Sequence, residues 1–327
     1  MRVATYLCPI ALLLTACSTA GTTSVTSPGA TSPPVSVPTS PSSAPTASPE
    51  PSSVDVPNVS NLVAGFGSLW ARSGSALWQI SPSGQVVSRT NNVFSDKVDA
   101  VGPQNLAVGS GSVWTVQPAT VLRIDPATGR VTARIDVASG CDDIVPGAGV
   151  MYLACRDSRL FTIDPDSNKA TLLTTTGVSP IGIAYGNGAV WWINFSEAGG
   201  VTKIDPSTGS RTSLSGPYAK FVIPSAHHIW FIDANGNVFS MDASGGHASR
   251  SVKKARDALG VAFDHGAVLI NDGDLVAFDA NTGGVTQRAD VSGKQSDQAV
   301  AGIAVLGSTI WLVDPKDQRI VAVADQS

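Results

Sequence analysis

From residue 59 to the C-terminus, short runs of apolar residues alternate with turn-forming residues, and the same order returns about every 40 residues. Each repeat has a Gly-rich turn, a short apolar strand with one aromatic residue, and a second turn about ten residues later. A period near 40 residues with strand-like content is typical of β-propeller blades. The shared aromatic position holds an aromatic residue in six repeats and an apolar leucine in one: Trp70, Trp114, Tyr152, Trp191, Trp230, Leu269 and Trp311.

The second turn of each repeat follows a common phrase, of which Ile124-Asp-Pro-Ala-Thr-Gly129 and Ile204-Asp-Pro-Ser-Thr-Gly209 are the fullest examples. Proline fixes φ, Asp and Ser bond to the nearby backbone, and Gly accepts a positive φ, so the phrase suits a tight turn. We interpret these turns as structural parts of the blades and not as a binding or catalytic site. The chain ends before a seventh such turn.

Each repeat divides into four short strands, which predicts an all-β, seven-bladed propeller over residues 54–327. In the second repeat these include an inner strand at residues 105–109, the aromatic strand at 113–116 and an alternating outer strand at 130–137. The last repeat supplies only three strands and ends with residues 319–324. An open sheet edge promotes aggregation. We therefore predict that residues 54–56 form the outer strand of the seventh blade and close the ring.

The first 16 residues predict a secretion signal, because a positive start is followed by an apolar run too short to span a bilayer. The run ends in Leu14-Thr-Ala-Cys17, which resembles the lipobox of bacterial lipoproteins. That resemblance implies cleavage before Cys17 and lipidation of its thiol. An ordinary signal peptide with a chance cysteine is the alternative. Residues 17–53 are almost only Ser, Thr, Pro, Ala, Val and Gly, which predicts a disordered tether.

These segments place the protein on the cell membrane, anchored by lipid on the extracytoplasmic side. The chain has 21 Lys and Arg against 25 Asp and Glu, a net charge of −4. This mild acidity argues against a nucleic-acid partner, for which a basic face is expected. We expect a monomer whose partners are the bilayer, through Cys17, and an envelope protein or cell-wall ligand.

Four cysteines reduce to two if Cys8 leaves with the signal and Cys17 carries lipid. The remaining pair, Cys141 and Cys155, lies symmetrically about Ala148, the centre of a predicted hairpin turn. An antiparallel register would place them opposite each other, within disulfide range. Disulfides persist in an extracytoplasmic compartment. We predict a Cys141–Cys155 disulfide, which would remove the free thiolate that cysteine catalysis needs.

The loops after the aromatic strands and the loops between blades emerge on one side of the ring, here named the loop face. The Gly hairpins and Ile-Asp-Pro turns emerge on the other side, here named the turn face. Binding residues normally lie on variable loops above a regular frame, so the loop face is the predicted site. Its loops are residues 96–103, 140–143, 156–159, 194–200, 217–221, 253–259 and 292–298.

Three residues after the aromatic position, several blades carry polar side chains that face this site. Three consecutive blades have aspartates there, which are candidate ligands for Ca²⁺ or Mg²⁺. The same aspartates also begin good turn sequences, so capping of backbone amides is the alternative. No other cofactor is indicated. The candidate ligand-binding residues are Gln117, Asn194, Asp233, Asp272 and Asp314, and the metal candidates are the three aspartates.

The blade phrases resemble a known group of proteins. Gly111-Ser-Val-Trp-Thr-Val-Gln117 and Gly188-Ala-Val-Trp-Trp-Ile-Asn194 are similar to the repeats of bacterial YVTN-type propellers and the virginiamycin B lyase-like superfamily. The lyases favour Asp-Gly-x-x-Trp-Phe-Thr-Glu, which no repeat carries in full, so no catalytic residue is transferred. Fold alone does not assign function.

Three functions remain open from the sequence. The first is a non-catalytic scaffold that binds an envelope protein or ligand through the loop face. The second is a metal-dependent lyase or lactonase-like hydrolase that uses Asp233, Asp272 and Asp314. The third is a glycan-binding module, for which exposed aromatics such as Phe195 or Tyr218 are expected on the loop face.

Overall fold

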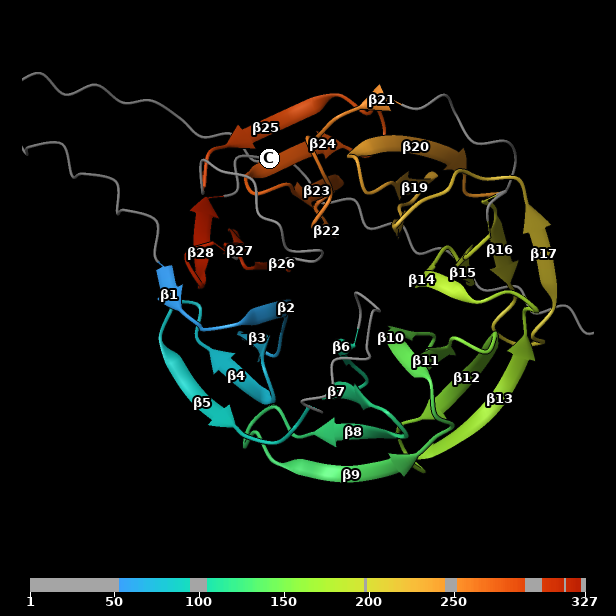
Figure 1. The fold of residues 1–327 in the computed structure, drawn as a ribbon, viewed down its shortest axis with the longest axis horizontal. Helices are drawn as coiled ribbons and strands as arrows, with labels where there is room; N and C mark the ends of the chain where they lie inside the picture. The colour runs from blue at the N-terminus through green and yellow to red at the C-terminus, as the bar shows by residue number, and fades with distance from the viewer. Residues whose placement is uncertain are drawn as a thin grey trace, which may run out of the picture. The chain divides into compact units, whose positions relative to one another are not determined.

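The computed structural model describes residues 53–94, 105–196, 199–244, 252–291, 302–314 and 316–324, all within the compact unit of residues 49–327. Their strands form seven sheets of four antiparallel strands, arranged as blades around a central channel (Figure 1). The predicted seven-bladed propeller is therefore confirmed. The predicted signal peptide, Cys17 and nearly all of the tether lie outside the described residues. Among those residues there is no helix with the length and apolar composition to cross a membrane.

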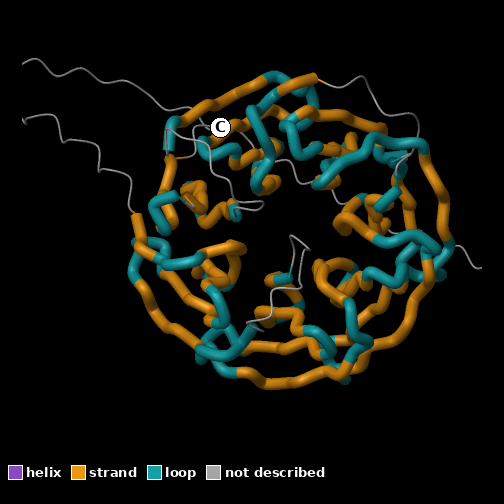
Figure 2. The backbone as a smooth tube through the Cα atoms, viewed as in Figure 1, coloured by secondary structure: helices purple, strands orange, loops and turns teal. Residues whose placement is uncertain are grey.

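In six of the blades the strands follow chain order from the channel to the rim (Figure 1), and Figure 2 shows the strands, in orange, arranged in a ring. The innermost strands are β2 (Val59–Gly65), β6 (Leu106–Gly109), β10 (Cys141–Gly147), β14 (Pro180–Gly186), β18 (Phe221–Pro224), β22 (Gly260–Asp264) and β26 (Ile303–Leu306). The second strands, which carry the aromatic position, are β3 (Ser68–Ser73), β7 (Ser112–Gln117), β11 (Val150–Cys155), β15 (Ala189–Asn194), β19 (His228–Ile232), β23 (Ala267–Asn271) and β27 (Thr309–Asp314).

The two outer positions complete each sheet. The third strands are β4 (Ala76–Ile80), β8 (Thr120–Ile124), β12 (Arg159–Asp164), β16 (Val201–Ile204), β20 (Asn237–Asp242), β24 (Leu275–Asp279) and β28 (Arg319–Ala324). The outermost strands are β5 (Val86–Thr90), β9 (Val131–Asp136), β13 (Lys169–Thr175), β17 (Arg211–Leu214), β21 (Val252–Lys253), β25 (Val285–Ala289) and, in the seventh blade, β1 (Ser53–Asp55).

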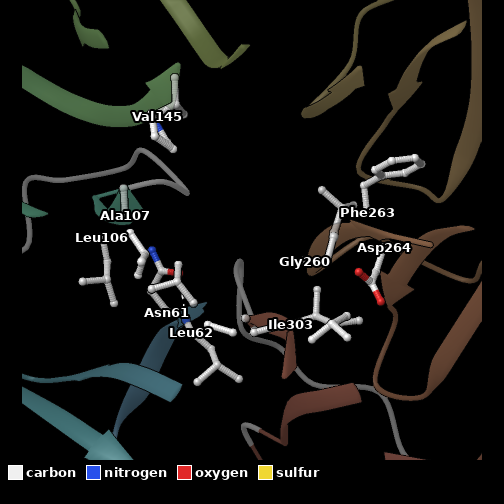
Figure 3. Close-up of a pocket in the computed structure, with 18 of the residues that line it drawn as sticks. Asn61, Leu62, Leu106, Ala107, Val145, Gly260, Phe263, Asp264 and Ile303 are labelled. Carbon is white, nitrogen blue, oxygen red and sulfur yellow. Dashed lines mark hydrogen bonds between the residues drawn. The ribbon is translucent and has the colours of Figure 1, made fainter. Parts of the chain in front are cut away.

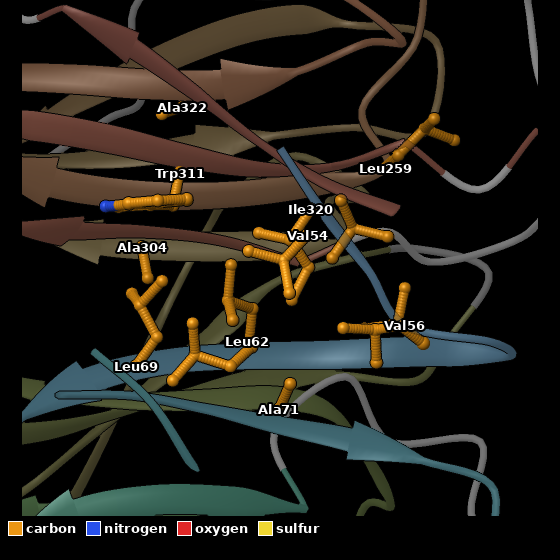
Figure 4. Packing of buried hydrophobic residues seen from close by; sticks show 13 residues of the cluster. Val54, Val56, Leu62, Leu69, Ala71, Leu259, Ala304, Trp311, Ile320 and Ala322 are labelled. Atoms are coloured by element: carbon orange, nitrogen blue, oxygen red, sulfur yellow. The ribbon is translucent and has the colours of Figure 1, made fainter. Parts of the chain in front are cut away.

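The seventh blade combines both ends of the propeller. β1 pairs antiparallel to β28, with Val54 opposite Ile320. The strand covers residues 53–55, one residue earlier than predicted, and Val56 follows it with its backbone N–H donating to the carbonyl of Gln318 at 3.0 Å. Val54 and Val56 are buried in one apolar cluster with Trp311 and residues of the first blade (Figure 4). Burial of these side chains holds the first strand to the last.

The aspartates of the Ile-Asp-Pro turns bond to their own turns. Asp125 accepts hydrogen bonds from the backbone N–H groups of Ala127 at 2.9 Å and Thr128 at 2.8 Å. Such bonds favour the charged carboxylate and lower its pKa, chiefly through the backbone of Thr128 at Asp125 and the hydroxyl of Ser207 at Asp205. The pKa is lowered in the same way at Asp125, Asp164, Asp205, Asp242 and Asp279.

The buried tryptophans fix the hairpins of their own blades. The indole N–H donates to a hairpin glycine carbonyl from Trp70 at 3.1 Å, from Trp114 at 2.8 Å and from Trp191 at 3.0 Å. Trp311 holds the same position in the seventh blade, and its Nε1 has no acceptor among the described residues. A buried donor without a partner costs free energy, so these tryptophans differ in what they contribute to stability.

This contrast gives a matched test. Trp114→Phe removes a hydrogen bond as well as part of a ring, whereas Trp311→Phe removes only the ring part and an unpaired donor. We expect Trp114→Phe to lower the free energy of unfolding by about 1 kcal/mol more than Trp311→Phe. Urea unfolding of the two variants measures the difference. Equal losses would mean that the bond to Gly109 contributes nothing.

Candidate functional site

Strand direction determines which residues reach each face. Because neighbouring strands are antiparallel, every innermost strand begins at the loop face and ends at the turn face. Several residues predicted as loop lie in strands, because the innermost strand of the third blade already starts at Cys141 and β18 starts at Phe221. The predicted loops 96–103 and 292–298 lie outside the described residues.

The innermost strands surround a cavity of about 380 Å³ in the central channel (Figure 3). Most of its lining is apolar, including Val108, Pro146 and Val305, and its polar side chains are those of Asn61 and Asp264. In Figure 3, Asn61 lies on one side of the cavity, whereas Phe263 and Asp264 lie on the other. The volume falls within the roughly 300–1,000 Å³ that small-molecule sites occupy.

At the loop-face ends of the innermost strands, the first three blades carry polar residues. Asn61 lies opposite Arg72, and Asp143 lies opposite Ala154. Arg72 and Ala154 are each two residues after the aromatic position of their blade. Asn105 is equivalent, since its carbonyl accepts from the N–H of Val116. All three are buried, and the Asn61 amide donates to the Asn105 side chain at 3.4 Å. The equivalent residues of the other blades are Gly182, Phe221, Gly260 and Gly302.

Sequence reasoning missed this arc of Asn61, Asn105 and Asp143. The prediction followed the residues after the aromatic strand, whereas the arc comes from the strand before it. The available signal was the innermost-strand residue that lies opposite the position two residues after the aromatic one. It was obscured by an irregular register, which shifts by one residue between Cys141 and Asp143 and again between Val59 and Asn61.

Next to this arc lies a buried ion pair. Asp142 accepts from the Arg156 guanidinium at 2.7 Å, and the Asp142 side chain is 10% exposed against 43% for Arg156. Burial raises the pKa of Asp142, and the hydrogen bond and charge of Arg156 lower it in part. The pKa of Asp142 is therefore higher in the folded chain than in the unfolded chain. The contribution of Asp142 to the free energy of unfolding is fully present below the unfolded pKa and is lost as pH rises through the folded pKa.

We therefore expect Arg156→Met to destabilise the fold at neutral pH, because it leaves a buried carboxylate without its partner. The exposure of Arg156 limits the loss to about 1 kcal/mol. The loss should shrink toward pH 4 and below, as Asp142 takes up a proton. Unfolding measured at both pH values tests this. Arg159→Met is the control, since Arg159 pairs with the half-exposed Asp157. A pH-independent loss at Arg156 would contradict the assignment.

The five predicted binding residues lie at the loop face with partners of their own. The Gln117 side-chain amide donates to the backbone carbonyl of Val93 at 2.5 Å, and the Asn194 side-chain oxygen accepts from the hydroxyl of Thr202 at 3.1 Å. Asp233 accepts from the backbone N–H groups of Asn235 and Asn237, both at 2.9 Å. These side chains therefore hold local loop structure.

The other two aspartates are more deeply buried. Asp272 accepts from the backbone N–H of Arg256 at 2.9 Å and lies 3.4 Å from its guanidinium. Asp314 accepts from the N–H of Lys316 at 3.2 Å and from Arg319 at 3.3 Å. Within the described ranges, no three His, Cys, Asp or Glu side chains are grouped so that they could hold a metal ion. The three aspartates are each engaged in turn capping or ion pairs.

Two aromatic side chains stand out from the loop face on neighbouring loops. Phe195, directly after β15, is 62% exposed, and Tyr218, in the connection between β17 and β18, is 56% exposed. The loops touch, because a Cβ on Gly199 would lie 2.9 Å from the backbone nitrogen of Tyr218. Nearby, burial lowers the pKa of Lys220, and its Nζ donates to the carbonyl of Ala258 at 3.1 Å. The loop face thus carries two exposed aromatic side chains on touching loops.

The sequence matches no protein-family profile and none of the curated proteins compared with it. Among solved structures, the fold is similar to hydrazine synthase of Kuenenia stuttgartiensis, with a TM-score of 0.62, 10% identity, and coverage of 83% of this chain and 97% of that one. It is also similar to the computationally designed Ika8 protein, with a TM-score of 0.59, 13% identity, and coverage of 83% and 98%. At such low identity these likenesses concern the fold alone. The chain is a seven-bladed β-propeller.

Proposed function

We propose that this chain is an extracytoplasmic lipoprotein, held on the membrane through Cys17, whose propeller binds another envelope protein through the loop face. The observation that carries the binding role is the pair of exposed aromatics, Phe195 and Tyr218, on touching loops. Aromatic residues are enriched in the cores of protein interfaces, where they bury large areas at a small cost in conformational entropy. A regular frame with irregular loops suits such a scaffold.

The test is cross-linking of the full-length chain in its own membrane, compared with the Phe195→Ala/Tyr218→Ala variant. Val87→Ala is the matched control, because Val87 is a similarly exposed apolar residue on the outer strand β5. We expect a cross-linked envelope protein that is lost in the double variant and kept in the control. A cross-link that survives in both variants would overturn the role of this face.

A glycan-binding module is the second candidate, because exposed aromatics also stack on sugar rings. Sedimentation with insoluble cell-wall saccharide distinguishes the two. Saccharide binding that Phe195→Ala and Tyr218→Ala abolish, without any cross-linked protein, would replace the protein partner by a glycan. Retention of the chain on saccharide in the double variant would exclude both aromatics from glycan recognition.

Lipid attachment is tested separately by metabolic labelling with palmitate. We expect label on the native chain and none on Cys17→Ser, which should also leave the membrane fraction after high-salt washing. A labelled Cys17→Ser chain would overturn the anchor at this residue. A single acyl chain gives only marginal binding, so stable anchoring requires more than one.

The alternative enzyme function depends on a bound divalent ion. Thermal unfolding with Ca²⁺, Mg²⁺ or EDTA tests it, since an ion present at 100 times its dissociation constant stabilises the native state by about 2.7 kcal/mol. A shift that disappears when Asp233, Asp272 and Asp314 become Asn would support the metal-dependent lyase or hydrolase. Unchanged melting in all conditions would leave these residues as turn caps.

A further inference from the structure

Arg72 places a charge at a position that five of the other blades fill with an apolar residue. It lies on β3, two residues after the aromatic position of the first blade. The one other polar residue at this position, Asn271, donates to the carbonyls of Gly302 at 3.2 Å and Val313 at 3.0 Å. The equivalent residues of the other blades are Val116, Ala154, Ile193, Ile232, Asn271 and Val313.

The guanidinium of Arg72 is buried and unpaired. The residue is 6% exposed, and the charge lies 4.7 Å from the centre of the Phe94 ring. In the part of the chain that the structure describes, no carboxylate or other acceptor pairs with it. Burial lowers the pKa of Arg72, but arginine stays charged at neutral pH. The ring attracts the charge only in part, so a buried cation without an anion costs free energy that a bound anion would recover.

A second unpaired donor lies at the same junction between blades. Asn61 is directly opposite Arg72, so the two side chains lie on one face of the first blade. That face meets the second blade, because the Asn61 amide donates to the side-chain oxygen of Asn105 at 3.4 Å. Asn105 is 6% exposed, and its own amide N–H groups have no acceptor within the described segments. The junction thus presents a guanidinium and an amide that both lack an acceptor.

A solute can reach these donors from the channel. Of the polar side-chain atoms in the described segments, those that are both unpaired and sealed from solvent belong to Trp78, Thr115 and Trp311. The nitrogens of Arg72 and Asn105 are not sealed in this way. Asn61 and Leu106 line the channel cavity, on the same side of it in Figure 3, and Leu106 shares an apolar cluster with Phe94. The donors therefore adjoin an apolar surface at the loop-face end of the channel.

We propose that the junction of the first two blades binds a small organic monocarboxylate at the loop-face end of the channel. The carboxylate accepts from the Arg72 guanidinium and the Asn105 amide, and the apolar end of the ligand lies toward Leu106. The planar fork of arginine matches a carboxylate, and one guanidinium among neutral amides balances one negative charge, which disfavours a phosphate dianion.

Neighbouring features leave this site separate from the others. Asp143, the carboxylate of the polar arc, belongs to the third blade and has an interaction of its own. Phe195 and Tyr218, which carry the proposed function, follow β15 and β17 of the fourth blade. The carboxylate site therefore does not depend on the proposed function.

Three probes test the proposal on the full-length chain at low chloride concentration. They are butyrate, neutral butyramide of nearly the same shape, and inorganic phosphate, with dissociation constants measured by ligand-observed NMR. We expect butyrate to bind about tenfold more tightly than butyramide, because its hydrogen bonds to a buried guanidinium are charge-assisted, and phosphate to bind more weakly than butyrate. No binding of butyrate, or equal affinities for butyrate and butyramide, would overturn the proposal. Tighter binding of phosphate would overturn the class of ligand.

Two arginine variants locate the site. Arg72→Met removes the charge and keeps a long side chain at a position where other blades are apolar, so the chain should fold and lose its preference for butyrate. Arg159→Met is the control, because Arg159 is a loop-face arginine that is paired with Asp157. It should leave the affinity for butyrate unchanged. A preference for butyrate that survives Arg72→Met would place the ligand elsewhere.

A carboxylate supplied by the chain itself gives a further test. Asn105→Asp keeps the side-chain shape and gives Arg72 a partner, so it should abolish butyrate binding and raise the melting temperature. The chain also carries Asp96 and Asp99 shortly after Phe94, outside the described residues. Butyrate binding that appears only when both of these aspartates become Asn would identify one of them as the natural partner of Arg72 and would overturn the proposal.

Discussion

Gly147→Ala is expected to lower the free energy of unfolding by roughly 1 to 3 kcal/mol, the usual cost of forcing an extra carbon into a packed core. The added Cβ would lie 2.1 Å from the Tyr185 ring. That ring cannot move freely, because it is stacked on Tyr152 with centroids 5.5 Å apart. Urea unfolding of the full-length chain gives the free energy.

Gly182→Ala is the matched control, since Gly182 also lies in an innermost strand and its added Cβ would make an ordinary contact, 3.5 Å from the carbonyl of Lys220. We expect a change within about 0.5 kcal/mol. A second check combines Gly147→Ala with Tyr185→Ala, which removes the clash. If the two substitutions together destabilise as much as their separate effects added, the contact between blades is not the cause.

Replacing Cys141 and Cys155 together with alanine is expected to lower the free energy of unfolding by about 3 kcal/mol, the chain-entropy value for a loop of roughly 15 residues. The disulfide joins residues separated by 14 positions. Both cysteines are buried in the apolar cluster of the second and third blades, so alanine leaves no polar group behind. Reductant should lower the stability of the native chain and leave the alanine variant unchanged. A reductant effect on both proteins would point to another redox-sensitive group.

The disulfide was predicted correctly with a register that is wrong in detail. The prediction centred the hairpin on Ala148, which by itself places Cys141 opposite Cys155. The observed hairpin pairs Gly147 with Val150, so a regular ladder would set Cys141 one residue out of step. The β-bulge at Asp142 absorbs that residue and brings the cysteines together. A bulge depends on tertiary packing and has no clear signal in a single sequence.

The fold itself was predictable, because each repeat carries its own period, aromatic position and turn phrase. The lining of the channel was less predictable. The repeats show what the blades share, whereas the cavity takes its character from positions at which the blades differ, such as Asn61 and Asp264 among apolar neighbours. Four blades place a glycine of the innermost strand against a side chain of the next blade, as Gly147 does with Tyr185, whereas the hairpin register of the sixth blade places Asp264 at that position. That contact lies between blades, and alignment of the aromatic positions does not reveal it.

The pairing of β1 with β28 has a consequence for the kinetics of folding. Val54 and Ile320 are separated by almost the whole propeller, so their contact raises the contact order and carries a large loop-closure entropy. The first six blades can form from local hairpins, but the seventh waits for the last strand of the chain. During that interval the unpaired edge of β28 can accept β1 from a second molecule. At high concentration, refolding should therefore compete with a domain-swapped dimer, and dilution should favour the closed monomer.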